Sequence, residues 1–559
     1  MAQKPAQSST SVLIVGAGPT GLALAIELGL RNIPTILLER NDRVGYAPRA
    51  KTTHTRTREH LRRWGIADKL AEASPFGVDY PSDVVFTTRL GGHALARFPN
   101  AFHCAPDQND AYSEHAQWIP QYKLEDVMRQ HVETLPTVEI RFSQEFVTAH
   151  QDADGVTVGL RDLAIGSDVE LRARYVVGAD GARSKVRDII GATLEGRYGL
   201  SRNYNIVFRA RGLAQAHSHG RAIMYWQINN DAPSLIGPMD TDDRWFFMPT
   251  ALPDGVTLSD SEAADLIRRS TGIDLPCEIL SRDEWVASQL IADKYRDSRI
   301  FLAGDACHLH PPFGGYGMNM GIADGVDLGW KLAAVISGWG GDGLLDSYEV
   351  ERREVHAQVI AEATSNHAVL ANQLWRPGLE DAGADGALAR EATQKAIRQA
   401  KAREFHSLGV VLGYCYTSSP IISYERIPSS ASEPMDFAPS AAPGRRAPHA
   451  WLNERTSLFD LFGPGYTLLA FGDSEKSLDA AQSDAHAAGV PLRVVQLERP
   501  DLARIYAASM ALIRPDMHVA WRGEHWPGPQ LIDLVAGKTA AAESALRDDR
   551  AGVREAHPI

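Results

Sequence analysis

The sequence of 559 residues predicts an α/β protein, α+β overall, made of a Rossmann-like dinucleotide-binding domain, an inserted β-sheet domain and a small C-terminal α/β domain. Three observations predict this class. An apolar strand enters a glycine-rich turn near the N-terminus, the middle of the chain is rich in β-forming aromatic residues, and short strands alternate with helical stretches after residue 446. A chain of this length can form several domains, each with its own core.

Composition and charge exclude several classes of function. The chain is 44% hydrophobic and 23% charged, as in an ordinary globular protein, and its net charge of −13 argues against nucleic-acid binding. The N-terminal stretch is polar, and no apolar run approaches the roughly 18 residues of a membrane span. The four cysteines lie far apart, so we expect reduced thiols in a cytoplasmic protein, with no disulfide, no metal site and no membrane partner.

The first motif, "VLIVGAGPTGLALAIELGLRNIPTILLER", reads as strand, turn, helix and strand. Its glycines allow a tight turn, close approach of a pyrophosphate and close packing of helix on strand, while the helix N-terminus attracts phosphate. Glu39, followed by Arg40, ends the second strand, where an acid binds a ribose hydroxyl. The turn residues expected to bind the dinucleotide are Gly16, Gly18, Pro19, Thr20 and Gly21.

The same glycine spacing recurs in "GWGGDG", at Gly338, Gly340 and Gly343. This copy follows a helical segment and precedes another, so it lacks the strand that gives the motif its mechanism. We therefore interpret it as a loop between helices, and the sequence predicts one dinucleotide site of this type.

Two further strands end in acidic turns. "YVVGADGARSKVR" leads to Asp180, and "RIFLAGDACHLHPPFGGYGMN" passes through Gly304 and Asp305 before a run of glycines. Together with "GAGPTG", and in this order, these motifs resemble the single-component FAD-dependent aromatic hydroxylases, the family of p-hydroxybenzoate hydroxylase and phenol hydroxylase. The resemblance covers roughly the first 400 residues.

The resemblance implies FAD as cofactor, with NADPH or NADH as transient reductant and O2 and a small phenolic molecule as substrates. Such enzymes hydroxylate the ring through a flavin hydroperoxide, and a homodimer is plausible by the same resemblance. Asp305 is expected at the ribityl chain or pyrophosphate, and the Pro312 carbonyl near the substrate and the reactive flavin edge. Further implied FAD contacts are Arg49, Gln121, Asp180, Gly304 and the backbone N–H groups of Gly317, Met318 and Asn319, whereas Arg56 and Thr57 match a pair that opens a helix.

The acceptor of the phenol proton stays open at this level. His310, in "HLHPP", and His54 are candidates, as are His103, Tyr204 and Tyr225, and Arg244 is a candidate anchor for a phenolate or carboxylate. We interpret His308 as structural. Some phenol hydroxylases place an acid near His54 where this chain has Lys51, and Asp327 stands where the family commonly has asparagine.

The predicted FAD-binding domain is discontinuous, covering residues 1–79, 115–200 and 290–400, with residues 80–114 and 201–289 forming the substrate-binding domain. In the latter, "RWFFMPT" is expected on the sheet that roofs the flavin, and the sparse charged residues favour a neutral phenol or a larger polyphenol. Three alternatives stay open: hydroxylation or Baeyer–Villiger oxidation of a larger aromatic polyketide, a flavoprotein dehydrogenase without oxygen activation, and a non-catalytic flavin-binding module.

A connector rich in Pro, Ala and Ser, within residues 401–445, precedes the C-terminal unit. Residues 446–559 resemble the thioredoxin-like C-terminal domain of the phenol hydroxylase branch. This region contains no cysteine, which excludes thiol–disulfide chemistry there, and we expect a role in packing or oligomer contact.

Overall fold

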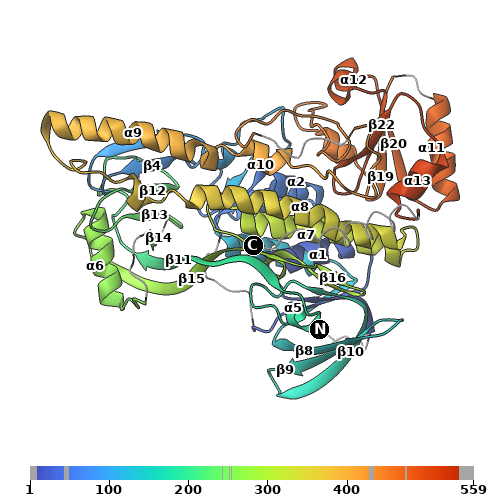
Figure 1. The fold of residues 1–559 in the computed structure, drawn as a ribbon, viewed down its shortest axis with the longest axis horizontal. Coiled ribbons are helices and arrows are strands. Elements are labelled where there is room, and N and C mark those ends of the chain that lie inside the picture. The colour runs from blue at the N-terminus through green and yellow to red at the C-terminus, as the bar shows by residue number, and fades with distance from the viewer. Residues whose placement is uncertain are drawn as a thin grey trace, which may run out of the picture.

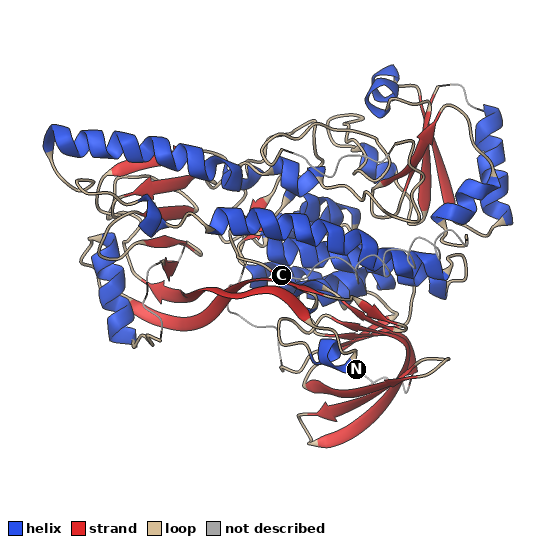
Figure 2. Cartoon of the chain, in the orientation of Figure 1, coloured by secondary structure: helices blue, strands red, loops and turns tan. Residues whose placement is uncertain are grey.

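The structure is a computed structural model that describes residues 9–42, 50–241, 243–250, 252, 255–426, 433–472 and 475–539. Three sheets are separated by a central group of helices (Figures 1 and 2). None of the helices in these ranges has the length and apolarity that crossing a bilayer requires. The arrangement is an α/β fold with mixed sheets and a separate C-terminal unit, as the sequence predicts in outline.

The first sheet has the order β16-β17-β10-β1-β2-β7, with β9 and β8 added beside β10. Its central strands β17, β10, β1, β2 and β7 run parallel, and in register Val15 lies opposite Gly178 and Gly178 opposite Leu302. The three sequence motifs therefore end side by side at one edge of the sheet. The strands are β1 (Ser9–Val15), β2 (Thr35–Leu38), β7 (Val138–Arg141), β8 (Gln144–Gln151), β9 (Val156–Asp162), β10 (Ser167–Gly178), β16 (Arg296–Asp297) and β17 (Ile300–Leu302).

Helices α1 (Pro19–Gly29) and α7 (Tyr316–Ile336) pack against each other unusually closely because α7 presents three glycines at a spacing of four residues. A Cβ atom at Gly321, Gly325 or Gly329 would lie only 2.3–2.8 Å from atoms of Thr20 or Glu27 on α1. Only hydrogen in place of a side chain permits this approach. It brings the N-termini of both helices to the same edge of the sheet.

The second sheet has the order β18-β15-β11-β14-β13-β12-β4-β5. Alternate residues of each strand face opposite ways: Met224 and Trp226 pack in the core beside the first domain, whereas Tyr225 packs toward α6 (Asp260–Thr271). Helix α9 (Gly383–Phe405) lies along the first of these faces (Figure 1). The strands are β4 (Val84–Thr87), β5 (Ala94–Phe98), β11 (Leu194–Arg209), β12 (Met224–Gln227), β13 (Ser234–Pro238), β14 (Arg244–Pro249), β15 (Glu278–Ala292) and β18 (His308–Leu309).

The remaining helices of the large domains cover or connect the two sheets. As predicted, the "GWGGDG" stretch is a loop between α7 and α8, where Gly341 donates a backbone hydrogen bond to Ala536 of the C-terminal unit. These helices are α2 (Thr55–Arg63), α3 (Ala67–Glu72), α4 (Gln121–Val132), α5 (Lys185–Ile189), α8 (Asp342–His367) and α10 (Leu408–Gly413), and a short ribbon pairs β3 (Thr52–Thr53) with β6 (Gln117–Trp118).

The C-terminal unit is a four-stranded sheet with the order β20-β19-β21-β22. β19 and β20 are parallel, and β21 and β22 are antiparallel to their neighbours. The strands are β19 (Tyr466–Phe471), β20 (Leu492–Leu497), β21 (Met510–Ile513) and β22 (Val519–Gly523), and the helices are α11 (Glu475–Ala487), α12 (Pro500–Tyr506) and α13 (Pro529–Val535).

Buried ion pairs attach this unit to the large domain. The Arg514 guanidinium lies 2.6 Å from Glu351 Oε1 and 2.9 Å from Asp327 Oδ1, and all three side chains are almost completely buried. Arg446 pairs with Glu59 on α2, with Nε 2.9 Å from Oε2. The C-terminal unit thus contributes charges to the interior of the large domain.

Candidate functional site

The glycine turn after β1 is shaped to receive a phosphate. Gly16 has a φ of +106°, and a Cβ there would lie 2.4 Å from the Ala179 carbonyl oxygen. A Cβ at Gly21 would lie 1.9 Å from the Gly16 carbonyl oxygen, so both glycines are required by packing. At Gly18, by contrast, no atom lies within 4 Å of the Cβ position. The open space at Gly18 adjoins the free N–H groups of the first turn of α1, which attract an anion.

The other residues expected around the turn have defined positions. Pro19 opens α1, and the Thr20 hydroxyl is directed toward Gly304 and Gly321. Glu39 accepts a hydrogen bond of 3.1 Å from the Ala17 amide, which ties the end of β2 to the turn. Arg40 is exposed beside Glu39, and Arg49 lies outside the described residues.

Asp305 is exposed at the edge where the three motifs meet, directly after Gly304, whose φ is +63°. The Gly304 amide donates to Asp324 Oδ2 at 2.9 Å, which fixes the turn that presents Asp305. An exposed carboxylate on a fixed turn is suited to bind hydroxyl groups of a ribityl or ribose chain.

Asp180 and Gln121 already have protein partners. The Asp180 carboxylate accepts from the Ser184 hydroxyl at 2.5 Å and the Val186 amide at 3.2 Å, and burial raises its pKa. The Gln121 side chain accepts from the Ala50 amide at 3.1 Å and donates to Glu125 at 2.7 Å. These bonds hold both side chains in place near the turn and use part of their bonding capacity.

The glycine loop before α7 is the second candidate cofactor contact. Gly314 and Gly315 have φ values of +88° and +72°, and the Pro312 carbonyl accepts from the Gly315 amide at 3.0 Å. The backbone N–H groups of Gly317 and Met318 belong to the first turn of α7, where a helix offers no acceptor of its own. They therefore form a fixed, positively polarised group that can stabilise negative charge on a bound ring.

Asn319 holds the loop to the β3 segment. Its amide nitrogen donates to the Thr52 and Gly315 carbonyl oxygens at 3.0 and 2.7 Å, and its oxygen accepts from the His54 amide at 2.9 Å and the Thr57 hydroxyl at 2.6 Å. Every bonding position of this side chain is directed toward protein, so its contribution to cofactor binding is confined to the backbone and to the shape of the loop.

Two histidines flank the loop. His54 Nε2 lies 2.9 Å from the Gly314 carbonyl oxygen, and burial lowers the pKa of His54 to about 4. The ring of His310 lies against Gly317 with Nδ1 3.5 Å from the Pro311 carbonyl oxygen, and burial lowers its pKa to about 3. Among the described residues, neither His54 Nδ1 nor His310 Nε2 has a hydrogen-bond partner. Both rings are therefore neutral near pH 7, each with one nitrogen left as an acceptor.

The other candidates have protein neighbours of their own. Tyr225 donates at 2.5 Å to the Gly220 carbonyl oxygen, and Tyr204 donates at 2.7 Å to that of Val256, both within the core facing α6. The structure does not bring either tyrosine to the glycine loop. Arg244 shares a strand face with Phe246, but its Nε lies 2.7 Å from Asp240 Oδ2. His103 stacks edge-on to His406, with ring centroids 5.8 Å apart.

A buried cluster lies behind the loop and was missed by the sequence analysis, apart from the structural interpretation of His308. Asp324 accepts from Arg352 at 2.7 Å, from His356 at 2.9 Å and from His308 at 3.1 Å, in addition to Gly304. Cys307 completes a group whose ligand-type atoms lie within 4.8 Å of one another. The only available sign was the polar pair Arg352 and His356 at helical i, i+4 spacing, and nothing in the sequence links that pair to Asp324.

The side chains of this cluster are arranged to stabilise the Asp324 carboxylate by hydrogen bonds, and they are poorly suited to bind a metal ion. Both histidine Nε2 atoms are directed at Asp324, and a cation there would face the Arg352 guanidinium. Burial raises the pKa of the Cys307 thiol well above its usual range, which disfavours the thiolate that a metal binds. The cluster fixes Gly304 and His308 relative to α7 and so supports the turn that presents Asp305.

The glycine loop faces the second sheet. Phe313, within the loop, lies 6.1 Å from Trp226 on β12, and both belong to an apolar core that includes Phe246 and Leu235. Trp118 on β6 lies 6.4 Å from Phe246 between centroids. Aromatic side chains of β6, β12 and β14 thus lie on the side of the sheet that meets the loop, where they can contact a planar ring.

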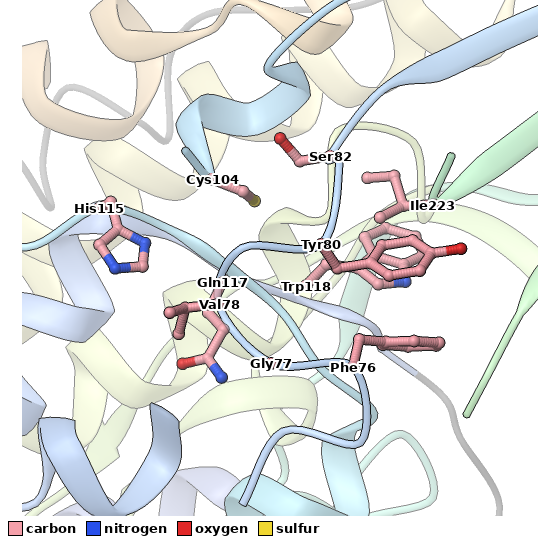
Figure 3. A pocket seen from close by; sticks show the side chains of 10 residues that line it. All are labelled: Phe76, Gly77, Val78, Tyr80, Ser82, Cys104, His115, Gln117, Trp118 and Ile223. Atoms are coloured by element: carbon pink, nitrogen blue, oxygen red, sulfur yellow. The ribbon is translucent and has the colours of Figure 1, made fainter. Parts of the chain in front are cut away.

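A small, shallow hollow lies along segment 76–82 and shares Trp118 with this region. In Figure 3, Phe76, Tyr80, Trp118 and Ile223 gather on one side of it, while Cys104 and His115 lie on the other. Trp118 is common to the hollow and to the surroundings of Phe246.

Two sequence families match the chain: residues 9–363 match a family described as "FAD binding domain", and residues 440–547 match "Aromatic-ring hydroxylase, C-terminal". The chain is 32% identical to tetracenomycin B2 monooxygenase-dioxygenase of Streptomyces olivaceus over 92% of its length and 95% of that protein. It is 30% identical to phenol 2-monooxygenase of Pseudomonas sp. (strain EST1001), over 96% of this chain and 94% of that one. The solved structure of the rebeccamycin biosynthetic enzyme RebC with reduced flavin is 34% identical and superposes with a TM-score of 0.88, covering 96% of this chain and 100% of that chain.

Proposed function

Because the chain belongs to the FAD-binding aromatic-ring hydroxylases, a family of flavoprotein monooxygenases, we propose that it uses NADH or NADPH and O2 to hydroxylate a phenolic ring. The observation that carries this proposal is the position of the glycine loop. The free N–H groups at the start of α7 lie opposite an aromatic sheet face, with a neutral histidine on each side of the loop.

The predicted cofactor, FAD, is the cofactor of this family, and the residues present fit it. Gly18 leaves space for the pyrophosphate, and Asp305 presents a carboxylate to the sugar chain. Gly317 and Met318 offer N–H groups to the flavin ring. When bound, FAD would accept two electrons from the nicotinamide and supply the chemistry that activates O2.

The protein's own residues position the substrate and handle its proton. Phe246 and Trp226 give a phenolic ring apolar contact and exclude water from it, which protects reactive oxygen from loss as hydrogen peroxide. A phenol reacts better as its anion, so its proton needs an acceptor. We assign this role to His310 Nε2 or His54 Nδ1, which have no other hydrogen-bond partner among the described residues.

A second candidate function is the oxidation of a larger, multi-ring aromatic compound. It is favoured by the likeness to tetracenomycin B2 monooxygenase-dioxygenase. Both candidates require an aromatic ring at the same loop, and they differ in the size of the molecule accepted.

We also propose that the C-terminal unit is thioredoxin-like. Its order β20-β19-β21-β22, with one parallel and two antiparallel pairings, supports this topology. Its buried ion pairs with the large domain support a packing role rather than a separate activity.

The test is anaerobic reduction of the flavin by NADH and by NADPH, with and without simple phenols and hydroxyanthraquinones, followed by mass analysis of products formed under isotopically labelled O2. We expect one class of phenol to accelerate reduction and to gain one labelled oxygen atom. Acceleration only by hydroxyanthraquinones would support the second candidate. Reduction that ignores every ring compound, with no label incorporated, would refute both and favour a dehydrogenase.

A further inference from the structure

We propose that Lys51 binds the ionised hydroxyl oxygen of the aromatic substrate, above the ring of Phe246. This inference rests on the proposed function and deepens it, because it selects substrates that carry a phenolate close to the reacting ring. It also makes Lys51 a specificity-determining residue, in a position where sequence comparison alone suggested only the loss of an acid.

The backbone around Lys51 is fixed on both sides. The Lys51 carbonyl accepts from the Ile119 amide at 2.7 Å, and the Ala50 carbonyl accepts from the Gln121 amide at 2.9 Å. The next residue, Thr52, is held by Asn319 at 3.0 Å. These bonds fix the point from which the Lys51 side chain starts, relative to β6 and to the helix that follows the glycine loop.

Thr52 also places Lys51 beside the glycine loop. A Cβ at Gly315 would lie 3.1 Å from Thr52 Cβ, so these two residues are in direct contact. Lys51 directly precedes this loop-contacting residue, and its ammonium lies 4.2 Å from the centroid of the Phe246 ring on the second sheet. It therefore reaches into the space between the loop and the aromatic face.

The ammonium of Lys51 has no carboxylate partner among the described residues. It makes a cation–π contact with the Phe246 ring. Among the described residues, the two fully buried lysines both have carboxylate partners. Lys331 is 2.7 Å from Asp327 and 2.6 Å from Glu351, and Lys401 is 2.8 Å from Glu404. Lys51 is half-buried against an aromatic ring, where a cation is less well solvated than on an open surface, so an anionic group of a ligand would be a favourable partner for it.

The surroundings suit the ring that would carry this anion. Trp118 pairs with Thr52 across the β3–β6 ribbon, and its indole lies 6.4 Å from Phe246. A planar ring in contact with Phe246 and Trp118 can place an oxygen at Lys51 while its edge faces the loop. Arg244 lies on the same face of β14 as Phe246 and is a second cation near this ring. Its charge is already paired with Asp240, 2.7 Å away. Burial lowers the pKa of Lys51 to about 8, and the group remains mostly charged near pH 7.

The experiment measures binding to the flavin-loaded enzyme of two probes, 2-hydroxyanthraquinone and its methyl ether 2-methoxyanthraquinone, in the wild type, Lys51→Gln and Lys69→Gln. Lys69 is an exposed lysine on α3 and serves as the matched control. We expect Lys51→Gln to weaken binding of the hydroxy probe about 10- to 100-fold, the effect of losing a charge-assisted hydrogen bond, and to leave the methyl ether unchanged. Lys69→Gln should match the wild type with both probes.

A measurement on the wild type alone covers the case in which Lys51→Gln does not fold. The hydroxy probe changes its visible absorbance on ionisation, and we expect the bound probe to ionise at lower pH than the free probe. The proposal is overturned if the wild type does not prefer the hydroxy probe to its ether, if the bound probe is no more ionised than the free one, or if Lys51→Gln retains the preference. A preference for the hydroxy probe without labelled oxygen in any product would refute the proposed function and leave the anchor standing.

Discussion

Arg514 offers the sharpest test of how the C-terminal unit stabilises the large domain. Its guanidinium contacts Glu351, Asp327 and Asp516 at 2.6–2.9 Å, and Lys331 contacts the first two of these acids at 2.6 and 2.7 Å. When all three carboxylates are ionised, two cations balance them only in part, which leaves one surplus negative charge in a buried site. Replacing Arg514 with Met preserves most of the volume and raises the surplus to two.

We expect Arg514→Met to lower the free energy of unfolding by about 3–5 kcal/mol, the cost of leaving a buried charge without its partner. The assay is equilibrium urea unfolding of the flavin-loaded protein, followed by tryptophan and flavin fluorescence. Arg522→Met is the control, because Arg522 pairs at 2.9 Å with Glu425, whose side chain is 51% exposed. That surface pair should contribute less than about 1 kcal/mol.

The double variant Arg514→Met with Asp327→Asn returns the cluster to one surplus charge, and it should recover about 2 kcal/mol of the loss. The effect also depends on pH. Burial already raises the pKa of Asp327 to about 7 in the wild type, and an acid whose folded pKa is raised destabilises the fold as pH rises through that value. The deficit of Arg514→Met should therefore be largest above about pH 7 and shrink near pH 5. An equal cost for Arg514→Met and Arg522→Met would refute the reasoning.

Three further predictions concern the site. Asp305→Ala should weaken FAD binding more than it alters the choice of ring substrate, as measured by flavin content after dialysis and by relative rates with several phenols; a fully loaded variant of unchanged stability would contradict this role. Gly18→Ala should fold normally but bind FAD weakly, because its added methyl group enters the open space proposed for the pyrophosphate. Gly21→Ala should lose both stability and flavin, since its Cβ would lie 1.9 Å from a carbonyl oxygen. Thermal unfolding with and without added FAD separates the two variants. Binding of 2-hydroxyanthraquinone should weaken as pH rises through about 8, because the lowered pKa of Lys51 means that its charge is present below that pH and lost above it. A binding constant that does not change between pH 7 and 9, in the range where the probe stays ionised, would contradict the role of Lys51.

The adjacency of the three sequence motifs was predictable because their signals are local. A strand that ends in Gly16, Asp180 or Asp305 can be recognised from a dozen residues of sequence, and parallel strands place their carboxyl ends at one edge. The register of Val15 with Gly178 and of Gly178 with Leu302 is the physical outcome of that rule. The family and its FAD cofactor follow from the same residues.

The substrate side was harder to predict because it depends on which face of a sheet meets the first domain. Alternation along β12 places Tyr225 and Trp226 on opposite faces of the sheet, but the sequence does not indicate which of them faces the glycine loop. The structure assigns that face to Trp226 and Phe313. The partners of Asp324 were hidden for a related reason, since Arg352 lies 28 residues away on another helix and only tertiary packing brings them together.

The position of Arg514 has a consequence for the order in which the protein can mature. Asp327 and Glu351 occupy the central helices, yet their shared cation is encoded 187 and 163 residues later. While the chain is being synthesised from its N-terminus, these acids lack that cation. We therefore expect the packing of α7 against α8 to be less stable until the C-terminal unit has been synthesised. Release of the finished chain, rather than completion of the FAD-binding segments, would then set the moment at which the enzyme can retain its flavin.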